Sequence, residues 1–152
     1  MTPDELCPLC GGTVAEVRGL MHWSEYDGVG GTILGGRCSA CDTDLRRRVA
    51  RGESPAWRAL VPPPELLRAA VSAEELPALT ARFERVTLFG QWWAEFLAYR
   101  QPGDEVWRFT GVDGTEGFAI VRQGRPLTQF LTPDPDFERG LLEREAKQSR
   151  SA

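Results

Sequence analysis

The stretch Cys7-Pro8-Leu9-Cys10-Gly11-Gly12 decides the fold of the first third of the chain, together with its counterpart Cys38-Ser39-Ala40-Cys41-Asp42. In each, two cysteines stand three positions apart, a spacing that lets both thiolates of a tight turn coordinate one metal ion. Gly11 permits the positive φ that such a turn needs, and Asp42 tolerates that region better than most residues. The two pairs predict one tetrahedral site of four thiolates, closed to substrates, with metal–sulfur distances of about 2.3 Å.

Zn²⁺ is the cofactor that this ligand set favours, and iron is the alternative because four thiolates suit both metals. A redox role for Cys-x-x-Cys would require a helix start in a βαβ context, which neither pair has. His22, the only histidine, could replace one cysteine as a ligand or be an ordinary loop residue.

This pattern resembles the zinc-ribbon family over roughly residues 4–52. The resemblance implies a structural zinc ion bound by Cys7, Cys10, Cys38 and Cys41, in a fold of two knuckles joined by a β-hairpin. Strands are expected at 13–18 and 31–34, and a third at 45–50. Such modules serve nucleic-acid binding, protein binding or structural stapling, so the fold leaves the function open.

A proline triplet at 62–64 marks the clearest boundary, because it continues neither a helix nor a central strand. We therefore expect a zinc ribbon over 1–52 and a linker over 53–64. A helical segment followed by an antiparallel β-meander is expected over 65–133. A charged C-terminal tail, able to form a short helix, is expected over 134–152.

The helical segment has two start signals and one long apolar stripe. Pro64-Glu65 suits a first helical turn, and Ser72-Ala73-Glu74-Glu75 matches the capping box. From Leu76 to Tyr99, apolar residues recur in steps of three and four, which predicts a helix with one apolar face. We expect a bend at Gly90.

Three strands are predicted after this helix, at 106–110, 118–122 and 127–131, with a two-residue turn at Gln123-Gly124. The helix is expected to cover the sheet face that bears Trp107 and Phe109. The predicted fold class is α+β, with helices packed on a three-stranded antiparallel meander. The segment 103–124 resembles a tail found in small bacterial proteins, a resemblance that implies no activity.

The net charge argues against a general nucleic-acid binder. The chain has 18 basic and 22 acidic side chains and a net charge of −4. Four thiolates and one Zn²⁺ would bring it to about −6, whereas nucleic-acid binders need a basic surface. The 152 residues contain no apolar run long enough to span a membrane, and we expect no secretory signal at the start. A cytoplasmic location is the expectation, and there cysteines bind metals more often than they form disulfides.

Two segments could contact a partner. The expected hairpin tip at 20–27 carries His22, Trp23 and Tyr26, and exposed aromatic side chains are good anchors for proteins. The alternative is that this loop folds back and Trp23 lies in the core. The only basic cluster is Arg46, Arg47 and Arg48 with Arg51; on a strand, Arg46 and Arg48 share one face.

No catalytic motif is present, so we expect no enzyme, although a site built from scattered residues stays open. The sequence favours a non-catalytic zinc-binding interaction protein that binds a protein partner as an adaptor, inhibitor or immunity factor. The alternative is a transcription- or phage-related nucleic-acid-binding protein that uses the arginine cluster. The oligomeric state is left open.

Overall fold

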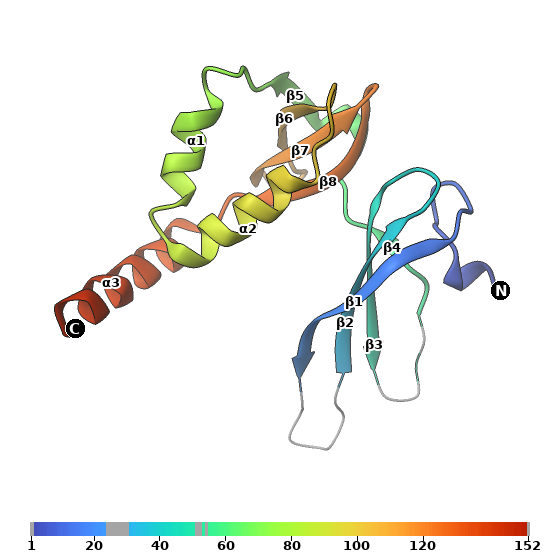
Figure 1. The fold of residues 1–152 in the computed structure, drawn as a ribbon, viewed down its shortest axis with the longest axis horizontal. Helices are drawn as coiled ribbons and strands as arrows, with labels where there is room; N and C mark the ends of the chain where they lie inside the picture. The colour runs from blue at the N-terminus through green and yellow to red at the C-terminus, as the bar shows by residue number, and fades with distance from the viewer. Residues whose placement is uncertain (1, 24–30, 51–52, 54, 152) are drawn as a thin grey trace. The chain divides into compact units, whose positions relative to one another are not determined.

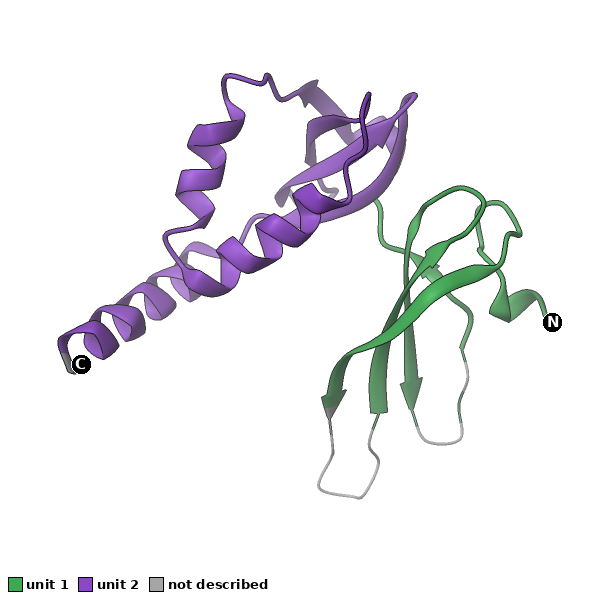
Figure 2. Ribbon diagram, in the orientation of Figure 1, with its two compact units in different colours: residues 1–61 green, residues 62–152 purple. Residues whose placement is uncertain are grey.

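The computed structural model describes residues 2–23, 31–50, 53 and 55–151. The chain divides into two compact units, residues 1–61 and 62–152, which Figure 2 colours separately. Each unit contains a four-stranded antiparallel sheet, and the α-helices belong to unit 2 (Figure 1). The predicted α+β class is therefore confirmed. Within the described residues, no helix has the length and apolar character needed to cross a membrane.

The sheet of unit 1 has the strand order β1-β2-β3-β4. Its strands are β1 (Val14–Trp23), β2 (Gly31–Cys38), β3 (Asp44–Ala50) and β4 (Arg58–Ala59). The first cysteine pair precedes β1, Cys38 ends β2, and Cys41 lies just before β3. The hairpin therefore brings both pairs to the same end of the sheet (Figure 1).

A small core supports this sheet beside the cysteines. Leu45 and Trp57 are buried together with Cys7 and Cys38. Gly36 lets Trp57 approach, because a Cβ built there would lie 3.2 Å from the Trp57 ring and 2.5 Å from Val14 Cγ1. Trp57 and β4 fall in the range that the sequence assigns to a linker, yet Trp57 packs in the core of unit 1.

The sheet of unit 2 has the order β5-β6-β7-β8. Its strands are β5 (Leu67–Ala70), β6 (Glu105–Thr110), β7 (Glu116–Arg122) and β8 (Arg125–Leu131). Its helices are α1 (Leu76–Phe83), α2 (Thr87–Ala98) and α3 (Pro135–Ser151). The last helix occupies the range predicted as a charged tail.

The start of unit 2 differs from the prediction. Pro64-Glu65 begins only a 3₁₀ turn, Pro64–Leu66, and β5 follows it. β5 pairs with β6, where Leu67 stands opposite Phe109, so the sheet has one strand more than predicted. The reason is tertiary, because Leu66 and Leu67 cover an apolar cluster on this sheet rather than continuing a helix.

The capping box is confirmed. The Glu75 N–H donates to Ser72 Oγ at 3.1 Å, and the Ser72 N–H donates to Glu75 Oε1 at 3.2 Å. α1 begins directly afterwards, at Leu76, with Pro77 in its first turn, where a missing N–H costs no helical hydrogen bond.

The predicted single helix to Tyr99 with a bend at Gly90 is wrong. The chain breaks at Val86, which is extended (φ −111°, ψ 124°), and α2 begins at Thr87. The N–H of Thr87, left open by this break, donates to Glu145 Oε1 of α3 at 2.8 Å. A contact from 58 residues away thus stabilises a helix end that local sequence does not reveal.

The predicted two-residue turn is confirmed, since Gln123 and Gly124 both have positive φ (52° and 78°), as a type I′ turn requires. The prediction that the helices cover Trp107 and Phe109 is wrong. Phe83, Trp93 and Phe96 of the helical segment pack on the opposite face. That face carries Val106, Phe118, Ile120, Leu127 and Phe130.

Candidate metal centre

The four cysteine sulfurs form one compact cluster. All four Sγ atoms lie within 4.8 Å of one another. The Cys7 and Cys41 sulfurs are 3.7 Å apart, and those of Cys10 and Cys38 are 3.4 Å apart. Sulfurs about 2.3 Å from a tetrahedral ion would be separated by about 3.8 Å. The cluster can therefore hold one metal ion, as the cysteine spacing predicts.

The two knuckles repeat the same backbone pattern. Gly11 N–H donates to the Cys7 carbonyl at 2.9 Å, and Asp42 N–H donates to the Cys38 carbonyl at 3.0 Å. Gly11 and Asp42 both have positive φ, 76° and 64°, as predicted. Each knuckle thus turns tightly enough for its two sulfurs to face the same point.

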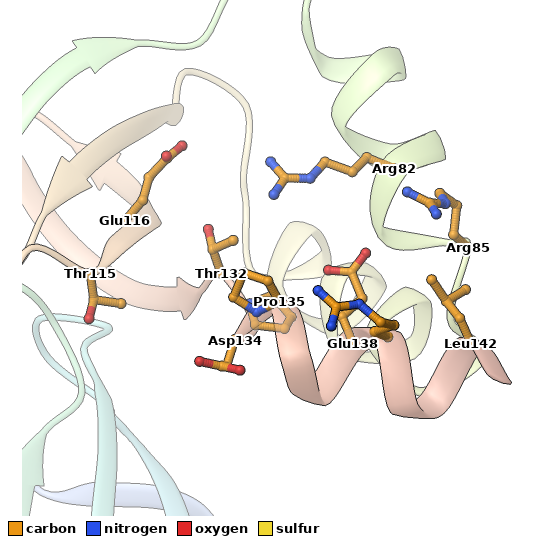
Figure 3. A pocket seen from close by; sticks show the side chains of 11 residues that line it. Arg82, Arg85, Thr115, Glu116, Thr132, Asp134, Pro135, Glu138 and Leu142 are labelled. Carbon is orange, nitrogen blue, oxygen red and sulfur yellow. The ribbon is translucent and has the colours of Figure 1, made fainter. Parts of the chain in front are cut away.

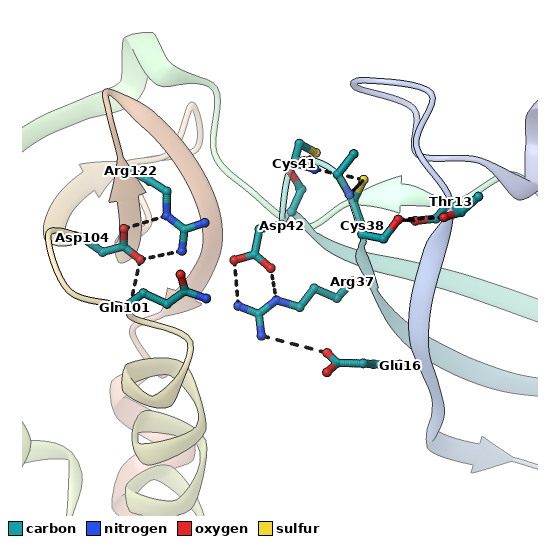
Figure 4. Close-up of polar contacts among 12 residues, drawn as sticks. Thr13, Glu16, Arg37, Cys38, Cys41, Asp42, Gln101, Asp104 and Arg122 are labelled. Carbon is teal, nitrogen blue, oxygen red and sulfur yellow. Dashed lines mark hydrogen bonds and ion pairs between the residues drawn. The ribbon is translucent and has the colours of Figure 1, made fainter.

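Asp42 has a further role that glycine at this place could not perform. Its carboxylate accepts two hydrogen bonds from the Arg37 guanidinium, one of them 2.9 Å long, and Arg37 also lies 4.0 Å from Glu16 (Figure 4). This paired contact ties the second knuckle to the end of β2. It stabilises the left-handed conformation of Asp42, which costs energy for a residue with a side chain.

Hydrogen-bond donors surround the sulfurs. The Gly12 N–H donates to Cys10 Sγ, and the N–H groups of Ala40 and Cys41 donate to Cys38 Sγ, each at 3.4 Å. Thr43 Oγ1 lies 3.0 Å from Cys41 Sγ, and Thr43 is fully buried. Donors aimed at a sulfur favour the thiolate, the form that binds metals.

The cysteines have unequal acidities in the metal-free protein. Burial raises the pKa of the Cys7 thiol to about 12. Burial would also raise the pKa of Cys41, but the Thr43 hydroxyl and N–H outweigh it and lower that pKa to about 6. The Gly12 N–H would lower the pKa of Cys10, but the neighbouring sulfurs of Cys38 and Cys41 raise it overall. A metal ion that binds here must displace the proton of Cys7, and Cys41 offers a thiolate at neutral pH.

Four protein ligands fill a tetrahedral coordination shell. Such a site leaves no position for water or substrate, and this distinguishes a structural site from a catalytic one. Cys7 and Cys38 are buried in the core beside Trp57, so a metal ion held by these cysteines would couple its binding to the packing of unit 1.

The other predicted residues lie apart from this cluster. His22 is exposed, and its Nδ1 lies 2.8 Å from Thr32 Oγ1, so it is not one of the four clustered ligands. The side chain of Trp23, the whole of Tyr26 and Arg51 lie outside the described residues. The exposure of Trp23 and Tyr26 in loop 20–27 therefore stays a prediction.

The arginine cluster lies on both faces of β3. Arg46 and Arg48 point to one face, as predicted, and Arg46 pairs with Asp44. Arg47 points to the other, where its guanidinium lies 5.7 Å from the Trp57 ring centroid and its Nε donates to the Pro55 carbonyl at 2.6 Å. The cluster is thus divided between a surface and the edge of the core.

Sequence reasoning missed two residues of the centre. Thr43 stands two positions after the second cysteine pair, just as Gly12 stands two positions after the first. This position directly after Cys-x-x-Cys-Asp could have indicated that the Thr43 hydroxyl lies near a sulfur. Gly12 is needed for space, since a Cβ there would lie 2.8 Å from Ala40 Cβ and 2.9 Å from Cys38 Sγ.

Comparisons of the whole chain found no match among protein families, curated proteins or solved structures. The likeness to a zinc ribbon therefore rests on the four clustered cysteines and on the hairpin that carries them.

Proposed function

We propose that the protein is a non-catalytic zinc-binding interaction protein in which a structural Zn²⁺ ion holds unit 1 together. The observation that carries the proposal is the cluster of four sulfurs within 4.8 Å, a ligand set that favours Zn²⁺. The test is metal analysis of protein purified under reducing conditions, with Cys38→Ser as the comparison. A content of about one zinc per chain would support the proposal. A stoichiometric content of iron would show that the structural ion is iron rather than zinc.

We further propose that the partner is a protein, which the chain would serve as an adaptor, inhibitor or immunity factor. Support comes from β1, an edge strand of the unit 1 sheet. Three of its apolar side chains are exposed: Val17 (53%), Leu20 (42%) and Met21 (60%). An edge strand with exposed apolar side chains can accept a strand or a hydrophobic surface from another protein.

The test uses a matched pair of apolar substitutions. Met21→Asp on β1 is expected to reduce capture of a specific protein partner from the native host. Val112→Asp, at a residue of unit 2 that is 95% exposed, is the control and is expected to change nothing. Equal capture by both variants would remove β1 as the contact surface.

Nucleic-acid binding is the second candidate, and a row of arginines favours it. Arg18 stands opposite Gly35, Gly35 opposite Arg46, and Arg46 opposite Arg58. Cross-strand neighbours point to the same face, so these three guanidinium groups share one side of the sheet with Arg48. Asp44 and Asp42 pair with Arg46 and Arg37 and weaken the field of this face.

Salt dependence separates the two candidates. A nucleic-acid binder should bind RNA or DNA at about 50 mM salt with an affinity that falls steeply as salt rises. Arg58→Gln should then weaken binding, while Arg68→Gln on β5 of unit 2 serves as the control. Absence of binding by the zinc-loaded protein would remove this candidate and leave the protein partner.

A further inference from the structure

A groove of about 750 Å³ lies in unit 2, between the end of α1, the start of β7 and the first turns of α3 (Figure 3). We call it the α1–α3 groove. Its volume falls within the range of about 300–1,000 Å³ that small-molecule sites occupy. None of its lining residues belongs to unit 1, so this groove is independent of the metal centre.

The groove holds charged side chains that do not pair with one another. Within the described part of the chain, neither Arg82 nor Arg85 makes an ion pair. The Arg82 guanidinium lies over the Phe83 ring, 5.1 Å from the ring centroid. Glu116 and Glu138 also line the groove, and their carboxylates have no cationic partner among those residues. Figure 3 shows Arg82 reaching from α1 toward Thr132 and Glu116, with Glu138 pointing into the same space from α3.

The remaining charges of the groove are already engaged. Asp134 caps α3, where its Oδ1 accepts hydrogen bonds from the N–H groups of Asp136 (2.9 Å) and Phe137 (3.2 Å). Arg139 lies 3.2 Å from Asp136. The groove therefore offers a ligand two guanidinium groups and two carboxylates.

Thr132 supplies an independent sign of a missing partner. Thr132 lines the groove, and its Oγ1 is buried and has no hydrogen-bond partner within the described residues. A buried hydroxyl without a partner is costly, and native structures seldom leave one unexplained. A polar ligand atom that came within hydrogen-bond distance of this hydroxyl would satisfy it.

We propose that the α1–α3 groove binds a zwitterion, an α-amino acid or a short peptide, with its carboxylate against Arg82 and Arg85 and its ammonium against Glu116 and Glu138. Arginine pairs well with a planar carboxylate through two parallel hydrogen bonds. A nucleotide or another polyanion fits less well, because it would bring negative charge beside two carboxylates without compensating them. The zwitterion balances both pairs of charges.

The test is an NMR titration of the full-length, zinc-loaded chain with trialanine. We expect saturable shifts of the Thr132 and Glu138 amide signals. N-acetyl-trialanine, which lacks the ammonium, and trialanine amide, which lacks the carboxylate, should each bind about tenfold more weakly. L-alanine that binds as tightly as trialanine would identify a free amino acid as the ligand, and weaker binding would identify a peptide.

Substitutions of the groove side chains test the same binding site, and changes at exposed positions should leave the fold intact. Arg82→Gln and Glu138→Gln should weaken trialanine binding, whereas Arg68→Gln and Glu95→Gln, at exposed positions outside the groove, should not. Thr132→Val should also weaken binding but should not lower the melting temperature, because the hydroxyl it removes has no hydrogen-bond partner in the described part of the chain. Equal affinity for capped and uncapped peptides, tighter binding of AMP, or no saturable shift with any probe would each overturn the proposal.

Discussion

Thr43→Val tests whether the centre is built to hold a thiolate. The substitution keeps the branched shape of a fully buried side chain and removes the hydroxyl 3.0 Å from Cys41 Sγ. A hydrogen bond to a charged group contributes about 1.5–3 kcal/mol, which corresponds to a 10- to 150-fold change in an equilibrium constant. We therefore expect the zinc dissociation constant to rise by about 10- to 100-fold, as for other partners of metal ligands.

The variant should also change the pH dependence of zinc binding. In the wild-type protein the pKa of Cys41 is lowered to about 6, so zinc meets a thiolate there at neutral pH. Without the Thr43 hydroxyl that pKa rises, and a proton must leave Cys41 before zinc binds. The affinity of the variant should therefore fall more steeply than that of the wild type as pH drops from about 8 to about 6.

The assay is competition for zinc against a chromophoric chelator under reducing conditions. Thr13→Val is the matched control, because the Thr13 hydroxyl lies 2.7 Å from Ser39 Oγ on the surface of the same knuckle region and makes no hydrogen bond to a sulfur among the described residues. A dissociation constant for Thr43→Val within about twofold of the wild type would refute the reasoning. Equal losses in Thr43→Val and Thr13→Val would show that the effect is not specific to the sulfur contact.

Three further substitutions probe the packing of the two units. Phe118→Ala should destabilise unit 2 by about 3–5 kcal/mol, measured by hydrogen exchange of β7 amides, because Phe118 is fully buried among aromatic rings. Gly36→Ala should destabilise unit 1 by about 1–3 kcal/mol, measured by hydrogen exchange of β2 and β3 amides, and an unchanged stability would contradict the close approach of Trp57. The Arg122 guanidinium, which donates two hydrogen bonds to Asp104 (Figure 4), lowers the pKa of that carboxyl. Their contact therefore stabilises unit 2 fully at pH values above the ordinary pKa of an Asp side chain, and this stabilisation is lost as the pH falls through the lowered pKa. Asp104→Asn should therefore lower the urea midpoint of unit 2 at pH 7, and the difference from the wild type should shrink in acid; a constant difference would exclude this linkage.

Local signals in the sequence were sufficient for the features that local chemistry decides. The cysteine spacing predicted the sulfur cluster, Ser72 and Glu75 predicted the capping box, and Gln123-Gly124 predicted the turn between β7 and β8. The capping box and the turn each depend on residues within a few positions of one another, so a single stretch contains the whole physical cause. The sulfur cluster joins two such local motifs about 30 residues apart, and the repeated Cys-x-x-Cys spacing identified both of them.

The errors concern contacts between distant residues. The helix break at Val86 depends on Glu145 as a partner for the open N–H of Thr87. The face of the sheet that the helices cover depends on which of Val106 and Trp107 points inward, a choice that alternation alone does not decide. Trp57 is buried because Gly36 of the unit 1 sheet has no side chain and lets the indole ring approach closely. The residues next to Trp57 in the sequence do not indicate this contact.

Hydrogen exchange of the full-length chain before and after zinc removal tests the central claim, that four thiolates and one zinc ion hold unit 1 together. We predict that a chelator releases about one zinc per chain and that the amides of β2 and β3 then lose their protection, while those of β7 and β8 keep theirs. A chain that releases no stoichiometric metal, or whose β2 and β3 amides stay protected after the metal has gone, would contradict the account.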